Sequence, residues 1–158
     1  MKTNDQTIGI LNDLIKINND RVEGYEKAIK DVAGNADLVR TFSEYADQSR
    51  DYSSELRSAV TGLGGDASDN TTVSGKIYRV WMDLRSAVSS SERASALDLC
   101  EYGEDAAQKA YKEALQEAST LPADILALVT TQKAELKRAH DTIKRLRDQQ
   151  RTVQQRQV

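Results

Sequence analysis

Glu101 and Glu104 are the residues whose type and spacing point most clearly to chemistry. They lie three positions apart in a segment with helical periodicity, and this spacing places two side chains on the same side of a helix. The apolar stripe of the segment turns both carboxylates inward, near the midpoint of the helix. A buried carboxylate is costly unless a metal ion or an opposing charge pairs with it. We therefore expect a buried polar site that contains both glutamates.

Metal binding is one chemistry that such carboxylates support. Di-iron helical bundles take one Glu from each of two helices and a Glu-x-x-His pair from each of the other two. The chain has a single histidine, His140, and Lys137 stands where that pattern would place the glutamate of its pair. Residues 36–63 contain no Glu-x-x-His pair either, so we expect no standard two-metal centre. The candidate ligands of a single iron or manganese ion are Glu26, Glu101, Glu104 and His140.

A hydrogen-bonded polar layer across the bundle explains the same glutamates without a metal ion. Such a layer can fix the register of helices while contributing little net stability. We favour this interpretation, which assigns no catalytic residue. The expected members are Glu101, Glu104, Gln108, Gln132, His140, Tyr25, Tyr52 and Tyr111.

Four long helices must position these side chains. The periodicity predicts them over residues 5–33, 36–63, 89–118 and 122–149, with a shorter helix over 73–88. Their boundaries carry residues that stop or start helices, namely Gly34-Asn35, Gly64-Gly65 and Pro122. We expect one domain over residues 1–149, followed by a frayed polar tail over residues 150–158.

The lengths of the connections predict the topology. Short connections after the first and third long helices require two antiparallel hairpins, whereas the long segment between the hairpins can run from one end of the bundle to the other. This is the topology of a ferritin-like bundle with one long crossover. The fold class is therefore all-α, with a short extra helix in the crossover. Trp81 is expected to anchor that short helix on the bundle, because its neighbours at helical spacing are apolar.

The chain resembles a family of uncharacterised bacterial four-helix-bundle proteins grouped with the ferritin-like superfamily. The segments that carry the resemblance are LNDLI at 11–15, GYEKA at 24–28, Gly75 with Trp81 and Leu84, EYGED at 101–105 through Tyr111, and His140-Asp141. They cover nearly the whole chain. The resemblance implies a ferritin-like fold and brings no established activity.

Composition narrows the class of protein. The formal net charge of -3 provides no general attraction to nucleic acid, and we expect no nucleic-acid partner. A single cysteine, Cys100, excludes an internal disulfide and favours a reducing compartment. We find neither a secretory signal pattern nor the roughly 18 apolar residues that a membrane span requires. The expected location is cytoplasmic.

Two functional hypotheses follow. The first, which we favour, is a non-catalytic structural or interaction module, linked to a stress response and assembled as a homodimer or other homo-oligomer through an exposed helix face. The second is a metal-binding oxidoreductase or metal-handling protein of ferritin-like type, with an incomplete carboxylate and histidine site for iron or manganese. The inward polar residues separate the two, because a metal protein needs at least three converging ligands.

Overall fold

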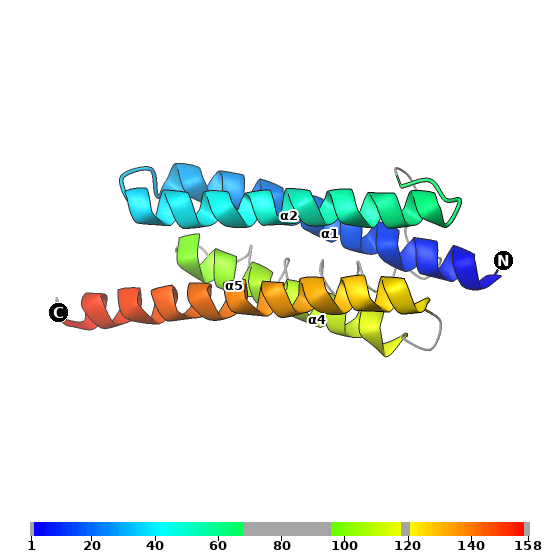
Figure 1. Cartoon of the computed structure of the whole chain (residues 1–158). Helices are drawn as coiled ribbons and strands as arrows, with labels where there is room; N and C mark the ends of the chain where they lie inside the picture. Colours follow the sequence, from blue (N-terminus) through cyan, green and yellow to red (C-terminus); the bar gives the residue numbers. More distant parts are fainter. Residues whose placement is uncertain (1, 68–95, 118–120, 157–158) are drawn as a thin grey trace.

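The computed structural model describes residues 2–67, 96–117 and 121–156, and these residues form an all-α four-helix bundle. The helices are α1 (Lys2–Asp31), α2 (Ala36–Gly62), α4 (Ala96–Gln116) and α5 (Ala123–Arg156). As predicted, α1 and α2 form one antiparallel hairpin, and α4 and α5 form another (Figure 1). The end of α2 and the start of α4 lie at opposite ends of the molecule, as a long crossover requires (Figure 1).

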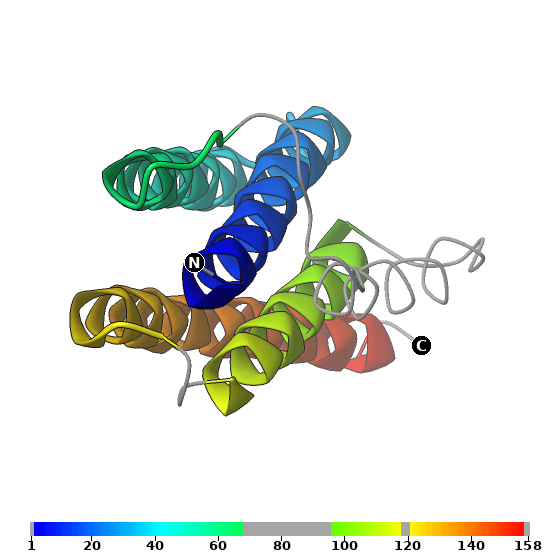
Figure 2. The same cartoon turned by 90° about the vertical axis from the view of Figure 1, so that its right-hand side faces the viewer.

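The expected short helix over residues 73–88, with Trp81, lies outside the described residues, as does the expected start of the third long helix at residue 89. Figure 2 shows the two hairpins viewed from the end of the bundle at which the chain begins. Within the described residues, no helix is both long and apolar enough to cross a membrane.

The boundaries of α2 follow from local chemistry. The side chain of Asn35 accepts a hydrogen bond from the backbone N–H of Leu38 (3.1 Å) and so caps the start of the helix. At the other end, the N–H of Gly65 donates to the carbonyl of Val60 (3.0 Å), and Gly64 has a φ of 81°. This left-handed turn is the glycine-dependent stop that the sequence predicted.

Gly65 also allows α1 to approach the end of α2. A Cβ atom at this position would lie 2.7 Å from Cδ1 of Ile8, so a larger residue would displace that side chain. The glycine pair thus ends α2 and lets the residues that follow it pack closely against α1.

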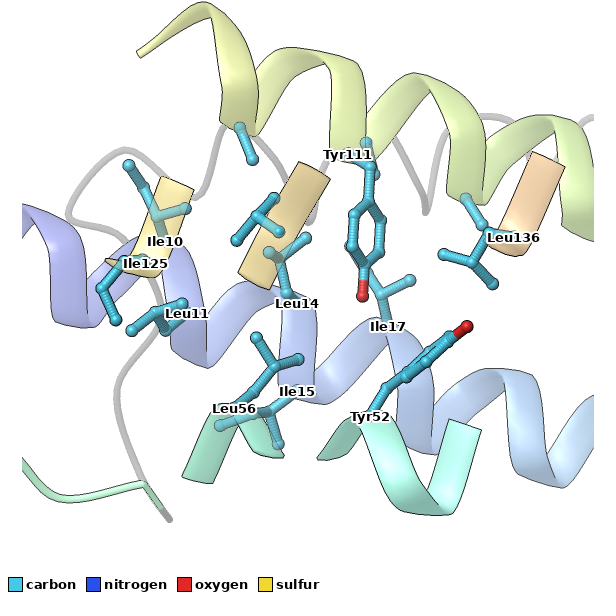
Figure 3. Packing of buried hydrophobic residues seen from close by; sticks show 14 of the residues in the cluster. Ile10, Leu11, Leu14, Ile15, Ile17, Tyr52, Leu56, Tyr111, Ile125 and Leu136 are labelled. Carbon is cyan, nitrogen blue, oxygen red and sulfur yellow. The ribbon is translucent and has the colours of Figure 1, made fainter. Parts of the chain in front are cut away.

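Two apolar clusters fill the bundle. The larger one draws on all four helices and includes Leu11, Leu14, Leu56, Tyr111 and Leu136 (Figure 3). The smaller one lies towards the other end and includes Tyr25, Phe42, Ala46, Leu97 and Ile143. Along α1 and α4, the residues between the two clusters include Arg21 and Glu104, which are both buried. The core is therefore divided by a polar layer.

The C-terminal end differs from our expectation. We predicted that residues 150–158 would fray, but α5 continues to Arg156. Arg151 pairs with Asp98 of α4 at 2.9 Å, and the hydroxyl of Thr152 donates to the backbone carbonyl of Asp148 at 3.0 Å. Because the contact with α4 is made by residues distant in sequence, local pattern alone does not reveal it.

Candidate functional site

The centre of the polar layer is a buried ion pair between α1 and α4. Arg21 and Glu104 are 3% and 1% exposed. Nε of Arg21 donates to Oε1 of Glu104 at 2.6 Å, and Nη2 donates to Oε2 at 3.2 Å, which is the bidentate geometry that arginine makes with carboxylates. The hydroxyl of Tyr25 donates to the same Oε1 at 2.9 Å. Arg21 thus supplies the opposing charge that a buried glutamate requires.

The charges of this pair support each other. Burial by itself would lower the pKa of Arg21, but the Glu104 carboxylate raises that pKa above its ordinary value, so the guanidinium stays charged. Burial and the neighbouring Glu104 both raise the pKa of Tyr25, so its hydroxyl stays protonated and donates a hydrogen bond to the carboxylate. Together they give a neutral, closed unit in the middle of the bundle.

Arg21 also joins α1 to α2. Its Nη1 donates to Oγ of Ser49 at 2.7 Å and to the backbone carbonyl of Tyr45 at 3.1 Å. The Ser49 hydroxyl in turn donates to Oδ1 of Asn18 at 2.9 Å. The two helices of the first hairpin are therefore tied together at the level of the ion pair.

Asn18 carries the network to the second hairpin. Its Nδ2 donates to the hydroxyl of Tyr111 at 2.8 Å, and that hydroxyl donates to Oε1 of Gln132 at 2.7 Å. Tyr111 reaches from α4 towards α1, past the apolar side chains of the larger cluster (Figure 3). Because Gln132 lies on α5, one chain of hydrogen bonds connects all four helices.

A second cluster lies at the interface of α4 and α5. Glu101 and Asp105 are one turn apart on α4, and His140 faces them from α5. Ligand atoms of the three side chains all lie within 4.8 Å of one another. Nε2 of His140 makes a hydrogen bond with Oδ1 of Asp105, while Nδ1 contacts Oδ1 of Asp141 at 3.1 Å.

Opposing influences act on the titration of this cluster. Burial and the nearby Asp105 raise the pKa of Glu101, whereas Arg147, whose Nη1 lies 2.9 Å from Oε2, lowers it; the net shift is upward. Burial would lower the pKa of His140, but its hydrogen bonds with Asp141 and Asp105 raise it above the ordinary value. The hydrogen bond from His140 is the main reason why the pKa of Asp141 is lowered.

Comparison with known proteins identifies the family. A family model described as a domain of unknown function (DUF2383) matches residues 6–117. The chain belongs to the DUF2383 family. No curated protein matches the chain. The matched residues of this DUF2383 protein comprise nearly all of α1, together with α2 and α4, and they include Arg21, Glu101, Glu104 and Asp105, whereas His140 lies beyond them.

The structure does not bring the four predicted metal ligands together. Glu26 is exposed, with 52% of its side chain accessible, and it pairs with Arg50 on the surface between α1 and α2. Glu104 belongs to the polar layer. Glu101 and His140 share the second cluster, to which the structure adds Asp105. Glu26 lies outside the cluster. Periodicity places it only at the edge of the inward face of α1, and its ion pair with Arg50 holds it on the surface.

This DUF2383 protein has a buried, hydrogen-bonded polar layer, but only half of the expected residues belong to it. Of the expected residues, Tyr25, Glu104, Tyr111 and Gln132 take part. Tyr52 lies in the larger apolar cluster, and Gln108 bonds with Lys133 on α5. Sequence reasoning missed Arg21, the residue at the centre, although its spacing from Asn18 and Tyr25 places it on the inward face of α1.

Cys100 is a free cysteine, and it is buried. Burial and the nearby Glu104 raise the pKa of its thiol, so the thiol is protonated at neutral pH. A protonated, buried thiol is a poor nucleophile, and it fits a packing role beside the polar layer.

Proposed function

We propose that this DUF2383 protein is a non-catalytic structural or interaction module with a ferritin-like architecture. The observation that carries the proposal is the position of Arg21. Its guanidinium binds both oxygens of Glu104 in the middle of the bundle, where a metal-binding bundle would hold its ion. A buried, permanently charged cation repels a divalent ion, and both oxygens of Glu104 already accept hydrogen bonds from it.

The polar layer suits a scaffold. A shift of one helix relative to its neighbours would leave Arg21 or Glu104 buried without a partner, which is strongly unfavourable, whereas the native register satisfies both. The hydrogen bonds that lead through Asn18 and Tyr111 to Gln132 extend this requirement to α5. The layer therefore favours a single arrangement of four helices and gives the outer faces a fixed geometry.

Charged outer faces offer a means of self-assembly. A groove between α2 and α5 is lined by five carboxylates, those of Glu44, Asp47, Asp51, Glu55 and Glu135. Basic side chains are concentrated further along α5, where Lys144 and Arg145 are exposed. We propose that two copies associate as a homodimer or larger homo-oligomer by pairing these surfaces. The buried free thiol agrees with a reducing, cytoplasmic location.

Two measurements test this function. Untagged protein should keep its helical circular dichroism and unfold cooperatively in the presence of a strong chelator, because the core needs no ion. Analytical ultracentrifugation should show an oligomer at low salt that dissociates at high salt, where charge pairs are screened. A chelator that unfolds the protein would refute the structural role, and a monomer at every salt concentration would refute the assembly.

The proposed link to a stress response is tested by survival of a deletion strain under oxidative challenge.

The alternative is a ferritin-like metal-binding oxidoreductase or metal-handling protein that uses Glu26, Glu101, Glu104 and His140 with iron or manganese. One observation favours it, namely that Glu101 and His140 share a cluster. The exposure of Glu26 and the pairing of Glu104 with Arg21 weaken it. Stoichiometric iron or manganese that is lost in Glu104→Ala, together with oxygen or peroxide consumption, would establish this alternative over the scaffold.

A further inference from the structure

We propose that Glu101, Asp105 and His140 form a binding site for one divalent transition-metal ion at the edge of the α4–α5 interface. The site is separate from the polar layer, since none of its three residues bonds to Arg21 or Glu104 in that network. It goes beyond the structural role proposed above, because a bundle that folds without metal can still bind an ion at its edge. Three observations carry the inference.

The first observation is convergence. Glu101 and Asp105 lie four positions apart, so they project from the same side of α4, and His140 faces them from α5. One ligand atom from each lies within 4.8 Å of the other two. Two ligands that bind one ion at about 2.1 Å lie at most about 4.2 Å apart. Modest side-chain rotations therefore bring the three atoms into one coordination sphere.

The second observation is the orientation of His140. Its Nδ1 contacts the carboxylate of Asp141 at 3.1 Å, and Nζ of Lys137 holds the other oxygen of Asp141 at 3.0 Å. A metal-binding histidine ordinarily donates one ring N–H to a carboxylate or carbonyl, which fixes the ring and leaves the other nitrogen for the ion. Here that other nitrogen is Nε2, which points at Asp105.

The third observation is the held position of Glu101. This residue is buried, and Arg147 contacts its Oε2 at 2.9 Å. Metal-binding carboxylates are commonly supported in this way by a hydrogen bond to one oxygen. Two carboxylates on the same side of α4 repel each other, and a divalent ion between them would remove that repulsion.

The donor set indicates the class of ion. One imidazole with two carboxylates suits zinc, iron(II), manganese(II) or cobalt(II), whereas a site for Ca²⁺ or Mg²⁺ would use oxygen atoms alone. Three protein ligands leave at least one position for water. The side chains of Asp105 and His140 are 40% and 17% exposed, so an ion can enter from the solvent.

The test uses the fact that His140 is the only histidine of the chain. In untagged protein its ring nitrogens give one unambiguous pair of ¹⁵N signals, which are followed during titration with ZnCl₂. We expect a shift of the Nε2 signal that saturates at one ion per chain. Isothermal titration with Zn²⁺ and the absorption spectrum of bound Co²⁺ provide independent readouts of stoichiometry and ligation.

Variants assign the ligands. Asp105→Asn and His140→Gln should each lower the affinity for Zn²⁺ at least tenfold, and Asp141→Asn should lower it several-fold by releasing the ring. Asp37→Asn is the matched control, because it removes an exposed carboxylate that lies outside the cluster, and its affinity should equal that of the wild type. Circular dichroism confirms that each variant is folded.

Two results would overturn the site. One is an imidazole spectrum that does not respond to stoichiometric Zn²⁺, which would leave the cluster as an ion-pair network around a protonated histidine. The other is equal affinity in wild type, Asp105→Asn and His140→Gln, which would place any bound ion elsewhere. The chelator experiment tests whether the bundle folds without a metal ion, and the zinc titration tests the site at its edge. Either proposal can therefore fail while the other stands.

Discussion

Glu101 and Glu104 lie three residues apart on α4, yet they belong to different kinds of site. Glu104 is 1% exposed and is bound on both oxygens by an arginine that cannot lose its charge at any ordinary pH. Glu101 is 7% exposed and shares its surroundings with a histidine, a second carboxylate and Arg147. The first arrangement is closed and permanently neutralised, whereas the second can exchange a proton or an ion with solvent.

Both carboxylates are buried, so depth alone does not distinguish their sites. What matters is whether the partner of each carboxylate is fixed. Arg21 reaches Glu104 from α1, across the junction between the two hairpins, so this pair couples the halves of the bundle. Glu101, Asp105 and His140 all lie within the second hairpin, so changes there need not disturb the first.

The largest expected effect comes from breaking the closed pair. Arg21→Met leaves Glu104 buried without a counter-charge, and removal of one partner of a buried pair costs about 3–5 kcal/mol. We expect a loss of this size in urea unfolding. The double variant Arg21→Met/Glu104→Leu should recover most of it, because no isolated charge remains.

Arg50→Met is the matched control for Arg21→Met. Arg50 on α2 pairs with Glu26 on α1, but both side chains are about half exposed. An exposed ion pair contributes about 0–1 kcal/mol, so this variant should be close to wild type. Equal losses in the two arginine variants would contradict the distinction between a closed and an open site.

A smaller effect is expected from Tyr111→Phe. The substitution keeps the ring in the core but removes the hydroxyl that links Asn18 to Gln132. Leaving a buried polar group without its partner costs about 1–3 kcal/mol, and we expect a loss within this range in chemical denaturation. The control is Tyr102→Phe, because Tyr102 is 47% exposed and its hydroxyl can bond to water. Identical stabilities of the two variants would show that the hydrogen bonds across the hairpins contribute nothing.

The open cluster should show itself in the pH dependence of stability. The pKa of His140 is raised above 6.5 in the folded protein, so the folded state binds this proton more tightly than the unfolded state. Its contribution is fully present below about pH 6.5 and is lost as the pH rises through the raised folded pKa. In chelator, wild-type Tm should therefore fall relative to that of His140→Gln between pH 6 and pH 8. Parallel Tm curves for the two proteins would show that the imidazole is not held by the carboxylates.

Most of the fold was predictable because its signals are local. Helical periodicity and the glycine pair at 64–65 place α2 to within a residue, and the turn requires the positive φ that Gly64 adopts. The two short connections then require antiparallel hairpins. None of these inferences depends on a contact between distant residues.

The site was less predictable because its contacts are tertiary. Arg21 was overlooked since a charged residue on a helix is ordinarily solvated, and its partner Glu104 lies 83 residues further along the chain. Glu26 was named as a candidate ligand, yet its pairing with the exposed Arg50 shows that it belongs to the surface. Asp105 lies one turn beyond Glu101, and only the position of His140 on α5 shows that the three residues meet.

The end of α5 also depends on a contact between residues that are distant in sequence. We expect the smallest of our predicted effects there. Arg151 pairs with Asp98 on α4 at 2.9 Å, but its side chain is 55% exposed, so the pair contributes at most about 1 kcal/mol. Arg151→Ala should leave global stability nearly unchanged while increasing amide hydrogen exchange in residues 150–156, because the last turns lose their anchor to α4. Arg145→Ala, at an exposed position of the same helix, provides the control. If the two variants show equal exchange rates, the contact with α4 does not stabilise the end of α5. The backbone hydrogen bonds within the helix would then be what keeps residues 150–156 from fraying.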